Sequence, residues 1–148
     1  MIIDAYPFRK RDCLGLLISE LCEAGNLDYL CGGFSFPGLQ KEVEKSLHFK
    51  TRTEGAYPSK PSKFHRISYA YFIYCGDYRN AALVMFRNAV KLYSLNWSDR
   101  YGEDEIKSVF TRMSQCFLSA LNALSLLENH DAYLKTTEPV SIYPKVFS

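Results

Sequence analysis

Apolar residues recur at helical spacing along most of the chain, in blocks that glycine, proline and polar residues separate. Spacings of three and four residues place apolar side chains on one face of a helix. The pattern predicts helices over 10–24, 64–76, 77–95 and 103–128, of which the last is the longest. A further helix is predicted to begin at Pro37, with Ser35 as its N-cap. Residues 51–63, with two prolines and little periodicity, are predicted to form a loop.

The stretch 69–93 carries the clearest local signal in the chain. An aromatic helix runs into Gly76, which can adopt φ > 0 and so end it, and a Gly-Asp-Tyr turn leads into the next helix. Adjacent alanines there allow a neighbouring backbone to approach closely, and a phenylalanine one turn further on fills the space beside them. These residues form the predicted repeat motif: Gly76, Tyr78, Ala81, Ala82, Phe86 and Ala89.

Three helix ends, at Gly25, Gly76 and Asn129, follow apolar helices at separations of about fifty residues. This spacing is longer and less regular than that of tetratricopeptide repeats, which have about 34 residues. We therefore predict an all-α fold, an irregular α-solenoid of stacked helix pairs with five or six helices. The helical part is expected over 1–134, and 135–148, with two prolines, as an extended tail.

Composition narrows the class of protein only a little. Hydrophobic residues make up 47% of the 148, charged residues 23%, and the net charge is +2. The basic clusters, Arg9-Lys10-Arg11 and Lys60, Lys63 and Arg66, match no nucleic-acid module, so we expect no nucleic-acid partner. No apolar run is long enough for membrane insertion. Five cysteines without a signal-peptide pattern at the start are typical of an intracellular protein.

Catalytic chemistry is not predicted. The three histidines, His48, His65 and His130, are scattered, and no cysteine pair has metal-ligand spacing. Glu103-Asp104-Glu105 fits the N-terminus of a helix, where acidic residues complement the helix dipole. We expect no metal, no cofactor, no small-molecule substrate and no enzyme activity.

Interaction surfaces are harder to locate from the sequence. Trp97 is either a plug beneath a loop or an anchor for a partner, and the tail aromatics Tyr143 and Phe147 dock either on this chain or on another. An alternative function is a helical-repeat adaptor that binds short peptides. Its clamps would come from one face of the helix over 77–95, at Asn80, Arg87, Asn88 and Lys91.

Three segments, in their order and spacing, resemble the large scaffold nucleoporin of the Y-shaped outer-ring complex, which combines an N-terminal β-propeller with a C-terminal α-solenoid. They lie in the solenoid of that family. The segments are Leu-Cys-Glu-Ala-Gly-Asn-Leu-Asp-Tyr-Leu-Cys at 21–31 with its continuation to 44, Tyr-Ala-Tyr to Met-Phe over 69–86, and Cys-Phe-Leu-Ser-Ala-Leu-Asn-Ala-Leu at 116–124 followed by Asp-Ala-Tyr at 131–133.

The resemblance implies a structural role in the nuclear pore complex at the nuclear envelope. It implies that the chain is an excised solenoid segment without the propeller, and that its partners are helical segments of other scaffold nucleoporins near the hub of the Y. A role in nucleocytoplasmic transport and mRNA export follows from the same resemblance. Binding is expected on the exposed side of the last helix and on the tail.

Overall fold

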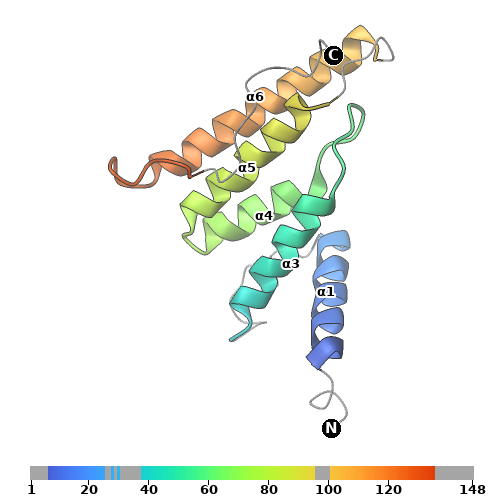
Figure 1. Ribbon diagram of the computed structural model, residues 1–148, viewed down its shortest axis with the longest axis vertical. Coiled ribbons are helices and arrows are strands. Elements are labelled where there is room, and N and C mark those ends of the chain that lie inside the picture. Colours follow the sequence, from blue (N-terminus) through green and yellow to red (C-terminus); the bar gives the residue numbers. More distant parts are fainter. Residues whose placement is uncertain (1–6, 26–27, 29, 31–37, 96–100, 136–148) are drawn as a thin grey trace. The chain divides into compact units, whose positions relative to one another are not determined.

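The computed structural model describes residues 7–25, 28, 30, 38–95 and 101–135, and within them all regular secondary structure is helical (Figure 1). Helix labels follow Figure 1. The helices are α1 (Pro7–Glu23), α3 (Gln40–Thr53), α4 (Lys63–Tyr74), α5 (Tyr78–Tyr93) and α6 (Glu103–Ser125). An isolated antiparallel bridge joins Tyr57 and Lys60 in the loop before α4. The predicted all-α fold is confirmed.

The chain divides into two units, Met1–Thr53 and Glu54–Ser148. In the first unit, α1 packs against α3, and one face of each is buried, with Ile18 and Cys22 on α1 and Val43 and Leu47 on α3. Lys50 on α3 donates a hydrogen bond to the Ser19 hydroxyl on α1. The helix pair therefore combines an apolar seam with a polar link.

The end of α3 differs from the sequence prediction. The loop predicted from residue 51 begins three residues later, because α3 continues to Thr53. In this last turn the Thr51 hydroxyl donates a hydrogen bond to the carbonyl of His48, and the Thr53 hydroxyl donates one to the carbonyl of Phe49. The predicted N-cap at Ser35 and start at Pro37 lie outside the described residues.

The second unit is a three-helix stack in which α5 packs against both α4 and α6 (Figure 1). Because two neighbours cover α5, its buried residues occupy more than one face: Ala81, Ala82, Val84, Met85, Asn88, Ala89 and Leu92. The edge-on contact of Phe86 with Phe117 and the hydrogen bond from Asn88 to Cys116 show that α5 and α6 run antiparallel. These three helices form the stacked arrangement that the sequence predicts.

The face that α6 buries is rotated from the one that its sequence predicts. Phe110 and Phe117 lie at helical spacing and would be expected on a core stripe, yet both are exposed. The buried residues are the smaller Val109, Cys116, Ala120 and Ala123. Small side chains let two backbones approach closely, and α5 likewise carries the fully buried Ala82 and Ala89. The large rings are therefore left at the edge of the contact.

Candidate interaction surface

The turn between α4 and α5 sets the direction of the stack. Gly76 has φ +74°, a conformation that residues with a Cβ rarely adopt. Its N–H donates to Ile73 O at 3.1 Å and the N–H of Asp77 donates to Phe72 O at 2.9 Å, which is the Schellman pattern. The Asp77 side chain then accepts from Asn80 N and caps α5. Helix end, turn and cap thus follow one another within five residues.

The residues of the predicted repeat motif occupy different layers of this stack. Ala81, Ala82 and Ala89 are fully buried, whereas Tyr78 and Phe86 are half-buried. The alanines lie where neighbouring helices approach α5, and Phe86 reaches the edge of the seam with α6, where its ring centroid lies 6.1 Å from that of Phe117. The motif thus spans the interior of the stack and its exposed rim.

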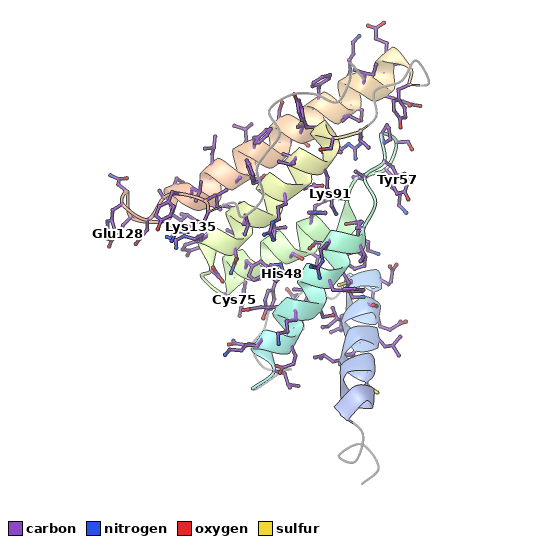
Figure 2. The ribbon with its side chains drawn as sticks, viewed as in Figure 1. His48, Tyr57, Cys75, Lys91, Glu128 and Lys135 are labelled. Atoms are coloured by element: carbon purple, nitrogen blue, oxygen red, sulfur yellow. The ribbon has the colours of Figure 1, made fainter. Side chains whose placement is uncertain are left out.

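A buried polar network that the sequence did not reveal connects the loop 54–62 to α4 and α5. The Glu54 carboxylate accepts from the backbone N–H groups of Lys63 at 2.7 Å and Phe64 at 3.0 Å, and so caps α4 from nine residues away. Its Oε2 also lies 3.3 Å from His65 Nδ1, and Lys91 Nζ donates to Glu54 O at 2.9 Å. Lys91 lies on α5 (Figure 2). A single residue of the loop thereby engages two helices.

His65 is neutral in this network. Burial is the largest cause that lowers the pKa of His65, and the positive charge of Lys91 is the second. The Glu54 carboxylate raises the pKa, but the net result is a pKa of about 4. Burial likewise lowers the pKa of Lys91. Because an ionised carboxylate only accepts hydrogen bonds, Nδ1 of the neutral ring carries the hydrogen that points to Glu54. The arrangement is typical of a structural hydrogen bond.

A second polar contact ties the same loop to α6. The Arg112 guanidinium donates to the carbonyls of Tyr57, Pro58 and Lys60, each at 2.7 Å. Hydrogen bonds from a charged donor are stronger than neutral ones. The loop predicted from its two prolines is therefore held at Glu54 and again by Arg112.

The residues suggested as peptide clamps are mostly engaged inside the stack. Asn88 is buried; it donates to Cys116 Sγ at 3.3 Å and accepts from the Ser62 hydroxyl. Lys91 binds the Glu54 carbonyl, and the Asn80 side chain donates to Asp77 at 2.6 Å. Of the four, only Arg87 is exposed. The polar face expected on α5 is thus partly an internal one, because α6 and the loop 54–62 cover it.

Several large apolar side chains of the described part of α6 are exposed. Leu118 and Leu121 are 59% and 61% exposed, and the exposed Phe117 lies one turn before Leu121 on the same face of the helix. The sequence shows these residues as apolar but does not tell which of them a neighbouring helix covers. Trp97, Tyr143 and Phe147, the interface residues suggested earlier, lie outside the described residues.

Within the described ranges, no group of three or more histidine, cysteine, aspartate or glutamate side chains is placed to hold a metal ion. None of the helices there is both long and apolar enough to cross a membrane. The clustered polar groups of the second unit bind backbone atoms of the same unit, as the Glu54 and Arg112 contacts show.

Stacked helices with an alanine-rich seam define a helical-repeat protein, and comparison with known proteins identifies which kind. The family model described as NUP160/120 middle TPR matches residues 1–126, so the chain belongs to this family of nucleoporin repeat segments. The family resemblance found in the sequence is therefore confirmed.

Similar curated proteins come from fungi and mammals. The chain is 28% identical over 137 residues to nucleoporin NUP120 of Chaetomium thermophilum and 29% identical over 135 residues to nuclear pore complex protein Nup160 of Homo sapiens. The matches cover 88% and 90% of this chain but only 11% and 8% of those proteins. No solved structure matches the chain significantly.

Proposed function

We propose that the chain is a structural scaffold segment of the nuclear pore complex, without enzyme activity. It acts at the nuclear envelope and supports nucleocytoplasmic transport and mRNA export by binding helical segments of other scaffold nucleoporins. The observation that carries this proposal is the family match over residues 1–126, since the matched relatives are nucleoporins.

The surface proposed for the partner is the outward side of α6, marked by Leu118 and Leu121. Two exposed leucines one turn apart suit a partner that contributes an amphipathic helix, which can lay apolar residues across them. Burying a leucine side chain fully stabilises an interface by about 1.5–3 kcal/mol. Because association itself costs free energy, this pair can supply only part of the affinity, and the surrounding contact must supply the rest.

Light scattering on a sizing column tests this proposal. The chain is mixed singly with helical segments of the other nucleoporins of the Y-shaped complex, and we expect a stoichiometric complex with at least one of them. The double variant Leu118→Ser/Leu121→Ser should lose that complex. The control Leu16→Ser removes a leucine of comparable exposure, 67%, from α1, and this variant should retain the complex. Unchanged monomer masses in every mixture would count against the scaffold function.

A further inference from the structure

The loop 54–62 contains a tight turn that the rest of the second unit holds in place. Residues 57–60 form a β-turn with Pro58 in its second position, where proline is favoured, and the N–H of Lys60 donates to Tyr57 O at 3.4 Å. From α6, Arg112 donates to the carbonyls of Tyr57, Pro58 and Lys60. The backbone of the turn is therefore fixed before any partner binds.

The Tyr57 ring is exposed on this turn and yet has a defined position. Tyr57 is 58% exposed, and its ring lies against Gly55, where an added Cβ would come within 2.9 Å of the ring atom Cε2 and of Oη. Figure 2 shows Tyr57 at the opposite end of the second unit from Cys75. An aromatic ring that is already held in place loses little entropy on binding, and tyrosine is frequent among the residues that dominate interfaces. Tyr57 therefore has the properties of an interface anchor.

The charges that follow Tyr57 along the chain are positive. Residues 55–66 include no acid, and both Lys60, in the turn, and Arg66, in the first turn of α4, are exposed. The preceding Glu54 carboxylate is bound to the N–H groups at the start of α4. On α6, Glu105 is the acid nearest to Arg112 in the sequence, and it lies about 10 Å away along the helix axis. Exposed charges at that separation are largely screened at physiological salt. The surface around Tyr57 therefore attracts carboxylates.

This surface is separate from the leucines of α6 proposed for a partner. Leu121 follows Arg112 by nine residues, which is two and a half helical turns, so the two side chains leave opposite sides of α6. A partner helix laid along Leu118 and Leu121 therefore faces away from the turn 57–60. The two surfaces suit different partners.

We propose that the turn 57–60 binds an acidic segment of a second partner protein, with Tyr57 as the apolar anchor and Lys60 and Arg66 as the charged contacts. A segment that carries an apolar residue beside two carboxylates can pack on the ring and complement both cations. The inference rests on the proposed function, because it gives the scaffold segment a second protein to hold. A nucleic-acid strand suits this surface less well, since one ring and two exposed cations offer few contacts to bases and phosphates.

Fluorescence anisotropy tests the inference with the full chain and the labelled helical segments of the other nucleoporins of the Y-shaped complex, each titrated singly. We expect an acidic segment to bind, and its affinity to fall as salt is raised. Tyr57→Ser and Lys60→Glu should each weaken this binding about tenfold. Gly55→Ala should also weaken it, because Gly55 does not have a positive φ and the added methyl group only displaces the ring. The matched controls Tyr74→Ser, at a tyrosine 64% exposed, and Arg87→Glu, at an exposed position of α5, should bind as the wild type does.

The variant Leu118→Ser/Leu121→Ser separates this inference from the proposed function. It should bind the acidic segment as tightly as the wild type, although it loses the complex expected on the sizing column. Circular dichroism verifies that each variant remains folded. If segments bind but Tyr57→Ser and Lys60→Glu leave every affinity unchanged, the inference fails and the proposed function stands. If no segment binds the wild type, both fail. Binding of a single-stranded uridine oligonucleotide that Tyr57→Ser abolishes, with no acidic segment bound, would assign the turn to nucleic acid and overturn the inference.

Discussion

The buried histidine of the second unit makes the stability of this protein depend on pH in a way that can be calculated. The pKa of His65 is about 4 in the folded chain, against its ordinary value of 6.5. The unfolded chain therefore binds a proton between these two values and the folded chain does not. The stability associated with neutral His65 is complete above pH 6.5 and is lost as the pH falls toward 4.

The size of the effect follows from the separation of the two pKa values. Each pKa unit corresponds to about 1.4 kcal/mol, so the full loss is about 3 kcal/mol, of which about 2 kcal/mol falls between pH 7 and pH 5. Other groups titrate in the same range, so the contribution of His65 must be isolated. The difference between the wild type and His65→Gln provides it, because glutamine occupies a similar volume and does not titrate.

Urea unfolding followed by circular dichroism at pH 7 and at pH 5 measures both free energies of unfolding. We expect the stability advantage of the wild type over His65→Gln to shrink by about 2 kcal/mol between the two pH values. His130→Gln, at an exposed position outside the buried network, controls for the loss of a histidine. If the difference between wild type and His65→Gln does not change with pH, His65 is not the buried neutral group described.

Three further predictions concern the packing of the second unit. Ala82→Leu should lower the free energy of unfolding by about 1–3 kcal/mol, because Ala82 is fully buried between packed helices; an unchanged melting temperature would contradict that packing. Gly76→Ala should cost about 1–2 kcal/mol through its positive φ alone, since a Cβ there meets open space. The matched variant Gly15→Ala, inside α1, should instead raise the free energy of unfolding by about 0.5–1 kcal/mol. If calorimetry shows that Gly76→Ala and Gly15→Ala change stability in the same direction, this reasoning is refuted. Arg112→Ala should cost about 2 kcal/mol in urea unfolding by removing three carbonyl contacts, whereas Arg87→Ala, at an exposed position, should cost little.

Local features of the second unit were predictable because they depend on neighbours in the sequence. The periodicity of apolar residues indicated α4, α5 and α6, and Gly76 followed by Asp77 indicated the turn that joins the first two. The start of α6 at Glu103 follows from its acidic first turn. In each case a few adjacent residues carry the physical cause.

The faces that these helices bury were less predictable, because they depend on distant residues. α6 buries the smaller Val109, Cys116 and Ala120 and leaves Phe117 exposed, although Phe117 also lies at helical spacing from other apolar residues. Glu54 and His65 are eleven residues apart on either side of a loop, and no spacing rule relates them. The sequence indicates that Asn88 is exposed to solvent, whereas in the fold Cys116 and Ser62 of the loop 54–62 are its hydrogen-bond partners.

The central claim, that this chain is a nuclear pore scaffold segment, is tested most directly by where the chain resides. A fluorescent fusion of residues 1–148 is imaged beside a marker of the nuclear envelope, together with its Leu118→Ser/Leu121→Ser variant. The account predicts a fluorescent nuclear rim for the wild type and loss of that rim for the variant. Diffuse fluorescence for both proteins would contradict it.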